Sequence, residues 1–335
     1  MRGKDKLEGQ VSRRRFINTA AGALSVIPLH RSIKNAFAGA IAEKPNSNFG
    51  GVRVGAITYS WRSLPGTPAD IINYCTQAGI STIELMGNVA EEYAGIPGGP
   101  VRPPRGTAQT EEQREAFKKA MAEAVEAQRK ARISLPMKKY EDLRKLFNDA
   151  GIDIHIVKFS PASWTDEEIE YSFNAARALG AKGVCNEIGE EACKRLAPFA
   201  EKHKLYAIFH QHVQPAQPGF SFDRFLAYSP AIMLNFDAGH YFGCTGLHPN
   251  GIIERLHDRI ISLHVKDKTG PKSNPPDANM VWGKGETPIA DILKLIQKEK
   301  WPIYCDIELE YDVPKDSDAV KEVKKCAEFA KAILV

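Results

Sequence analysis

The sequence YAIFHQH (residues 206–212) is followed by IMLNFD (232–237) and IISLHV (260–265), and each run carries a histidine or an aspartate at or near its C-terminal end. The runs are short and almost continuously apolar, which is typical of parallel strands that are buried on both faces. Runs of the same kind lie on both sides of this stretch, and they bring the number of predicted strands to eight. The other five are 52–59, 82–85, 153–159, 183–188 and 303–308.

Helical patterns lie between these predicted strands. Segments 68–78, 138–150 and 165–179 each end at or beside a glycine, which is the preferred residue just after a helix. The segment 165–179 also begins with Thr-Asp-Glu-Glu, which supplies an N-cap and acidic residues in the first turn. Eight strand–helix units in about 290 residues predict an α/β protein that forms a single-domain (β/α)8 TIM barrel. No GxGxxG pattern follows a predicted strand, so the main signal of a dinucleotide-binding fold is missing.

The N-terminal residues have the features of an export signal. SRRRFI (residues 12–17) is a twin-arginine pattern, a mildly apolar stretch follows it, and Ala36-Phe37-Ala38 fits a cleavage site between small residues. We therefore expect residues 1–38 to be a twin-arginine signal peptide, 39–50 a linker and 51–335 the barrel. The mature protein should be periplasmic or secreted. No segment is long and apolar enough to predict a membrane span.

The charge of the chain is concentrated in this leader. The first 38 residues carry eight Lys or Arg and two acidic residues, whereas the whole chain has a formal charge of +4, so the remainder is close to −2. A mature protein of that charge lacks the basic footprint of a nucleic-acid-binding protein, and we expect no such partner. The six cysteines contain no CxxC pair, which argues against a zinc ribbon or a disulfide scaffold.

Four metal-ligand residues lie at the C-terminal ends of the last four predicted strands. They are His210, Asp237, His264 and Glu308. In a barrel these ends converge on one mouth, and burying such groups is costly unless they pair or bind a cation. Mixed nitrogen and oxygen donors suit one divalent ion such as Mn, Co or Zn. For any one histidine alone, an ordinary buried histidine is the alternative.

Other ionisable residues flank this set and are predicted to be catalytic. Strand alternation places His212 on the same face as His210, and Lys266 on the same face as His264. Beside a divalent ion, Lys266 should have its charged form disfavoured and could donate to a substrate oxygen. The alternative for this lysine is a salt bridge to Asp267 or Glu310. The predicted catalytic residues are Glu187 (base or further ligand), His212, His240 and Lys266.

The motifs FDAGH (236–240), LHVKD (263–267) and IELEYD (307–312) occur together on late strands. As a set they resemble the sugar phosphate isomerase/epimerase group of the xylose-isomerase-like barrels, over about residues 52–335. The resemblance implies a divalent metal held by Glu, Asp, His and Glu on the last four strands. Asp237, His264 and Glu308 match three of these positions, and His210 stands where the ketose epimerases have Glu.

This difference bears on the reaction. In the epimerases the replaced Glu and the last Glu act as a paired acid and base, so the resemblance does not carry ordinary ketose C3 epimerisation over to this chain. FHQH (209–212) is similar to the His-x-His variants of exported members, some of which resemble 3-keto-glycoside eliminases and hydratases. A small sugar or glycoside is the expected substrate. Its predicted binding residues are Glu84, Lys158, Trp61 and Glu310.

The expected function is a metal-dependent isomerase, epimerase or lyase that takes a proton from the carbon next to a carbonyl. The 3-keto-glycoside eliminase or hydratase is the alternative with the same site, and it would need a partner sugar oxidoreductase. A non-catalytic periplasmic sugar-binding protein is an alternative of another class. An endonuclease-IV-like phosphodiesterase is disfavoured by the charge and the export signal. Homo-oligomerisation stays open.

Overall fold

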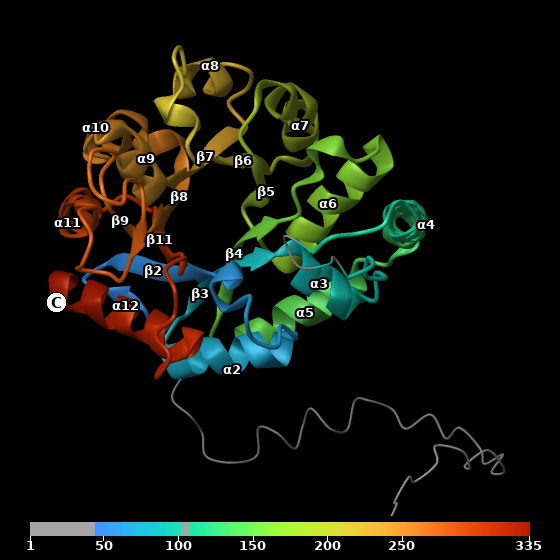
Figure 1. Ribbon diagram of the computed structural model, residues 1–335, viewed down its shortest axis with the longest axis horizontal. Coiled ribbons are helices and arrows are strands. Elements are labelled where there is room, and N and C mark those ends of the chain that lie inside the picture. The colour runs from blue at the N-terminus through green and yellow to red at the C-terminus, as the bar shows by residue number, and fades with distance from the viewer. Residues whose placement is uncertain (1–43, 102, 104–106) are drawn as a thin grey trace, which may run out of the picture. The chain divides into compact units, whose positions relative to one another are not determined.

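The computed structural model describes residues 44–101, 103 and 107–335, so the predicted signal peptide lies outside the described residues. Eight parallel strands form a closed barrel in chain order, because the last strand pairs with the first (Figure 1). The predicted (β/α)8 TIM barrel is confirmed. Its strands are β2 (Val52–Ile57), β3 (Thr82–Met86), β4 (Asp153–Lys158), β5 (Gly183–Glu187), β6 (Tyr206–His210), β7 (Ile232–Asp237), β8 (Ile260–Val265) and β11 (Tyr304–Ile307).

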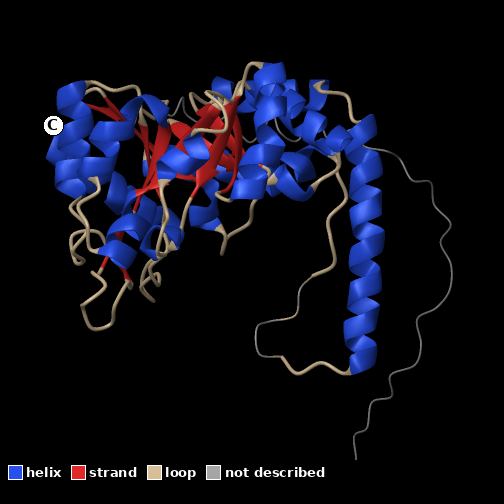
Figure 2. Cartoon of the chain, turned by 90° about the horizontal axis from the view of Figure 1, so that it is seen from above, coloured by secondary structure: helices blue, strands red, loops and turns tan. Residues whose placement is uncertain are grey.

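Helices surround the strands, and the long helix α4 extends away from the barrel (Figure 2). Thr67, Thr110 and Thr165 each form a capping box at a helix start, which satisfies backbone N–H groups there. The helices are α2 (Pro68–Ala78), α3 (Gly87–Ala94), α4 (Glu111–Ser134), α5 (Lys138–Asp149), α6 (Asp166–Leu179), α7 (Glu190–His203), α8 (Phe222–Leu226), α9 (Ala238–Thr245), α10 (Asn250–Leu256), α11 (Ile289–Glu299) and α12 (Ala319–Leu334). None of the helices in the described residues is both long and apolar enough to cross a membrane.

Short elements complete the fold. The strand β1 (Asn48–Phe49) pairs antiparallel with β2, and the side chain of Ser47 is buried against Ser81. The end of the predicted linker 39–50 therefore contacts the barrel through Ser47 and β1. A hairpin of β9 (Asp267–Lys268) and β10 (Asn279–Met280) follows β8. The 3-10 helices are η1 (Thr58–Trp61), η2 (Pro161–Ser163), η3 (Gln214–Ala216) and η4 (His257–Arg259).

Several strands are shorter than predicted because the chain leaves the sheet at the barrel mouth. The run 52–59 ends at Ile57, where η1 begins, and the run 206–212 ends at His210. The side chain of Gln211 then donates to the Asp237 backbone carbonyl and accepts from the Asp237 backbone N–H. This side chain takes over the backbone pairing that a longer β6 would have made.

The barrel interior is filled beneath the mouth by a separate apolar cluster. Cys185 and Ile208 lie two residues before Glu187 and His210, so strand alternation turns them to the same side as these polar residues. The cluster consists of Ile156, Cys185, Ile208, Met233 and Ile261. This cluster therefore packs below Glu187 and His210 on their strands.

Candidate metal centre

The four predicted ligands meet in one place. His210 and Asp237 are the last residues of β6 and β7, His264 is the penultimate residue of β8, and Glu308 directly follows β11. All four side chains are buried. One donor atom from each lies within 4.8 Å of the donor atoms of the other three. The parallel register that aligns these strand ends therefore gathers two imidazoles and two carboxylates.

Two of the donor atoms face each other across the site. His264 Nδ1 and Glu308 Oε2 are 2.9 Å apart, and the Lys266 ammonium lies 2.5 Å from Glu308 Oε2. His264 Nδ1 is buried and makes no well-aligned hydrogen bond with a described residue, and a buried polar atom of this kind costs about 1–3 kcal/mol. On the other side, His210 Nε2 lies 3.2 Å from Asp237 Oδ2. A divalent cation would bind these nitrogen and oxygen atoms together, so the donor set fits a metal with mixed nitrogen and oxygen ligands.

Glu84 lies behind His264 and does not face the mouth. Its Oε2 atom is 2.7 Å from His264 Nε2 and accepts a hydrogen bond from Asn235 Nδ2, also at 2.7 Å. Burial alone would raise the pKa of Glu84, but the charge and hydrogen bond of His264 outweigh it and lower the pKa to about 2. Glu84, which was predicted to bind substrate, is fully buried and contacts His264 and Asn235.

Trp61, which was predicted to bind substrate, lies in the core. Its side chain is 1% exposed, with its ring centroid 5.9 Å from that of Tyr74. The reason is local, because η1 turns the chain inward directly after β2. Among other aromatic residues near strand ends, Tyr59 is exposed, whereas Phe159 and Tyr241 are buried and Trp164 packs against the core.

Glu187 lies on the side of His210 that is opposite Asp237. Its Oε2 atom is 3.3 Å from His210 Nδ1, and its Oε1 atom is 2.7 Å from the ammonium of Lys158. Burial alone would raise the pKa of Glu187, but His210 and Lys158 hold it well below its usual value. Lys158, predicted to bind substrate, is therefore the ion-pair partner of this carboxylate.

Lys266 lies among three carboxylates. Its Nζ atom is 2.9 Å from Asp237 Oδ2, 2.5 Å from Glu308 Oε2 and 2.8 Å from Glu310 Oε2. Burial alone would lower the pKa of Lys266, but these carboxylates hold it above its usual value. Of the two salt bridges given as alternatives for this lysine, the one to Glu310 is present. Asp267 does not pair with Lys266, because its Oδ2 atom accepts from the backbone N–H groups of Gly283 and Gly285.

With this geometry in place, the chain can be compared with known proteins. Residues 123–332 match the family model of the xylose isomerase-like TIM barrel. The chain belongs to this family. No curated protein matches the chain at a significant level.

Solved structures with the same barrel share little sequence with this chain. A sugar phosphate isomerase/epimerase from Parabacteroides distasonis is 18% identical, with 88% of this chain and 100% of that chain covered and a TM-score of 0.55. The probable 3-DHS dehydratase AsbF from Bacillus anthracis is 13% identical, with coverages of 83% and 98% and a TM-score of 0.56. The IolI protein with a bound zinc atom is 13% identical, with coverages of 85% and 99% and a TM-score of 0.53. Likeness at these identities shows the fold.

In this xylose isomerase-like barrel, the accessible polar groups stand on the mouth side of the donors. The side chain of His212 is 49% exposed, and its ring centroid is 4.6 Å from that of His210 and 5.0 Å from that of His240. Burial and the charge of His210 lower the pKa of His212 to about 4, so its imidazole is neutral at pH 7. His240 Nε2 lies 3.5 Å from Glu310 Oε2 at the rim. These groups are the ones that a bound molecule can reach.

One further polar residue belongs to the site although the sequence did not single it out. Asn235 Nδ2 lies 3.0 Å from His264 Nε2 as well as donating to Glu84. The signal was its position two residues before Asp237, which places both side chains on the same face of β7.

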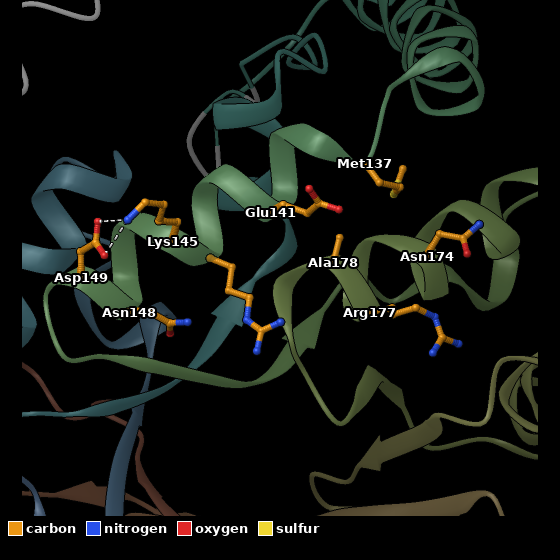
Figure 3. A pocket seen from close by; sticks show the side chains of 9 residues that line it. Met137, Glu141, Lys145, Asn148, Asp149, Asn174, Arg177 and Ala178 are labelled. Carbon is orange, nitrogen blue, oxygen red and sulfur yellow. Dashed lines mark hydrogen bonds and ion pairs between the residues drawn. The ribbon is translucent and has the colours of Figure 1, made fainter.

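This barrel also has a hollow that lies away from the four donors. It has a volume of about 630 Å³ and lies on the outer surface between α5 and α6 (Figure 3). The side chain of Lys145 is paired with Asp149, which lies on the same helix. No predicted site residue lines this hollow, so the chemistry remains at the mouth.

Proposed function

We propose that this chain is a metal-dependent enzyme that removes a proton from the carbon next to a carbonyl of a sugar or keto-glycoside. The observation that carries the proposal is the buried set of two imidazoles and two carboxylates, whose donor atoms lie within 4.8 Å of one another. Family membership supports it, since structures with this barrel include proteins described as a sugar phosphate isomerase/epimerase and a probable dehydratase.

The metal would be held by His210, Asp237, His264 and Glu308. When bound, a divalent ion polarises the substrate carbonyl and stabilises the negative charge that develops there, which is worth several kcal/mol. Two imidazole nitrogens favour Zn or Co over Mn, because Mn prefers oxygen ligands. We therefore place Zn and Co ahead of Mn as the resident ion.

The residues on the mouth side would move the protons. His212 is the base in this proposal, because it is exposed at the mouth and its Nε2 atom lies 3.7 Å from Glu187 Oε2, which can orient it. General-base catalysis of this kind typically contributes about 10²–10⁴-fold. Lys266 and His240, both beside Glu310, would donate to substrate oxygens. Return of the proton to another carbon gives an isomer or epimer, and loss of a β-substituent gives elimination.

A 3-keto-glycoside eliminase or hydratase is the second candidate. The observation that favours it is His210, whose Nδ1 atom faces Glu187 and whose Nε2 atom faces Asp237. An imidazole held at both nitrogens cannot serve as the free carboxylate that paired acid–base epimerisation uses. This candidate requires a partner oxidoreductase that makes the 3-keto sugar.

The test is metal analysis of the purified protein, followed by NMR of 3-keto-glucosides and free ketoses in deuterated water. We expect deuterium at the carbon next to the carbonyl, and the product separates lyase from epimerase. His212→Ala should lower the rate about 10²–10⁴-fold and keep the metal. His248→Ala, which removes an exposed histidine near Asp291 on the outer surface, should change neither. Unaltered glycoside recovered in a tight complex would instead indicate a binding protein.

We also propose that residues 1–38 direct twin-arginine export, so that the enzyme works in the periplasm or outside the cell. The support is the order of SRRRFI, an apolar stretch and a small-residue cleavage site. Protein recovered from the periplasm or medium should begin at Gly39. Replacing Arg13 and Arg14 by lysine should retain the full-length chain in the cytoplasm, and export of that variant at the wild-type level would contradict the proposal.

A further inference from the structure

We infer that Glu84 and Glu187 are positioning residues that fix the two histidine ligands so that opposite ring nitrogens face the cation. His264 would present Nδ1 and His210 would present Nε2. This inference rests on the proposed metal site. It gives separate roles to two carboxylates that the sequence assigned to substrate binding and to base catalysis.

The pair of His264 and Glu84 is more deeply buried than the pair of His210 and Glu187. His264 and Glu84 are both fully buried, and His264 Nε2 is 2.7 Å from Glu84 Oε2. An ionised carboxylate can only accept, so Nε2 carries a proton toward Glu84. The other nitrogen, Nδ1, points toward Glu308 at 2.9 Å and Asp237 at 3.8 Å. A cation held among these donors would take the lone pair of Nδ1, while Glu84 keeps the ring proton on Nε2.

Asn235 holds Glu84 in this position. Its Nδ2 atom donates to the same Glu84 oxygen that faces His264. The carboxylate comes from β3 and the amide from β7, so the contact crosses the interior of the barrel. Rotation of the Glu84 carboxylate would break both hydrogen bonds, and the orientation of the imidazole is fixed with it.

His210 shows the same arrangement with its nitrogens exchanged. Its Nδ1 atom is 3.3 Å from Glu187 Oε2, and its Nε2 atom is 3.2 Å from Asp237 Oδ2. Lys158 holds the other oxygen of Glu187 at 2.7 Å. Glu187 therefore contacts the imidazole of His210 and would act on the cation through that ring.

The expected effect follows from how such carboxylates act. A carboxylate that accepts from the far nitrogen of a ligating histidine raises its basicity and fixes its ring, and loss of that carboxylate typically weakens metal affinity about 10–100-fold. Glu84→Gln and Glu187→Gln remove one charge each with little change in volume. Each variant should therefore bind Zn²⁺ or Co²⁺ about 10–100-fold more weakly than the wild type, as measured by competition with a chelator.

Asp306→Asn is the matched control. Asp306 is fully buried in the same barrel and bonded to a histidine, with its Oδ2 atom 2.8 Å from His155 Nε2. It lies opposite His264 in the register of β8 and β11, but its side chain forms its hydrogen bonds with His155 and Ser262 and none with the four donors. This variant should lose stability and keep the wild-type metal affinity. The comparison separates an effect on the cation from the general cost of altering a buried carboxylate–imidazole pair.

The outcomes are distinguishable. If wild-type protein binds neither Zn²⁺ nor Co²⁺, the proposed function itself is wrong. Wild-type protein that binds, together with folded Glu84 and Glu187 variants whose affinity is within twofold of it, overturns only this inference. Should Glu84→Gln fail to fold, ¹⁵N NMR of Zn-loaded wild-type protein decides the question. The proton should be found on Nε2 of His264 and on Nδ1 of His210, and the reverse assignment contradicts the inference.

Discussion

Glu308→Gln is expected to remove the metal and to lower the rate of deuterium incorporation by about 10³-fold, since the cation contributes several kcal/mol and each 1.4 kcal/mol is about tenfold in rate. The buried Oε2 atom of Glu308 lies 2.9 Å from His264 Nδ1 and 2.5 Å from the Lys266 ammonium. A neutral amide of the same size keeps the volume but loses the charge that binds a cation. Metal analysis and the NMR assay measure the two effects.

Glu322→Gln provides the comparison for this variant. Glu322 is also a buried glutamate, but it belongs to α12 and accepts from Tyr311 and Ser317 rather than facing the mouth. It should keep both the metal and the rate. Wild-type protein stripped by a chelator should behave like Glu308→Gln and recover when Zn²⁺ or Co²⁺ is added. A Glu308→Gln protein with full metal content and full rate would remove the basis of the proposed site.

Arg132→Met is expected to lower the free energy of unfolding by about 3–5 kcal/mol, the typical effect of removing one partner of a buried ion pair. Arg132 lies near the end of α4, with its Nε atom 2.8 Å from Glu91 Oε1 and its Nη1 atom 2.9 Å from Glu168 Oε1. Its guanidinium also lies 3.7 Å from the ring centroid of Trp164. Without the arginine, two carboxylates stay largely buried and uncompensated. Urea unfolding measures the loss.

An exposed pair on the same helix is the control for this loss. Arg114 and Glu111 form an ion pair at 2.7 Å, with side chains that are 58% and 74% exposed. Solvent screens such a pair, so Arg114→Ala should change the stability by at most about 1 kcal/mol. Replacing Arg132, Glu91 and Glu168 together by apolar residues of similar size should restore much of the stability. A loss of under about 1 kcal/mol for Arg132→Met would show that other contacts hold α4.

The fold was predictable because strands of a closed parallel barrel must be apolar on both faces. The predicted runs 232–237 and 260–265 match β7 and β8 at both ends. The predicted run 206–212 is two residues longer than β6. The apolar pattern cannot show where a side chain replaces backbone pairing, as Gln211 does. The packed strand β1 was missed because two residues are too few to make a pattern.

The donor set was predictable for a different reason. His210, Asp237, His264 and Glu308 lie at or next to strand ends, and the topology brings strand ends together. The contact between Glu84 and His264 was not predicted, because Glu84 lies two residues before the end of β3 and reaches His264 across the barrel. Sequence alone cannot reveal a contact between residues so far apart along the chain. It also could not show that η1 turns Trp61 into the core.

The pairing of β11 with β2 joins the last strand of the barrel to its first. During synthesis, the ribosome must therefore release almost the whole chain before the ring can close. Glu308 is the last donor to be made, so the complete set of four exists only after translation has passed that residue. A cation bound as proposed could therefore meet all four donors only at the final stage of folding, and a truncated product that lacks β11 would lack both the closed ring and the fourth donor.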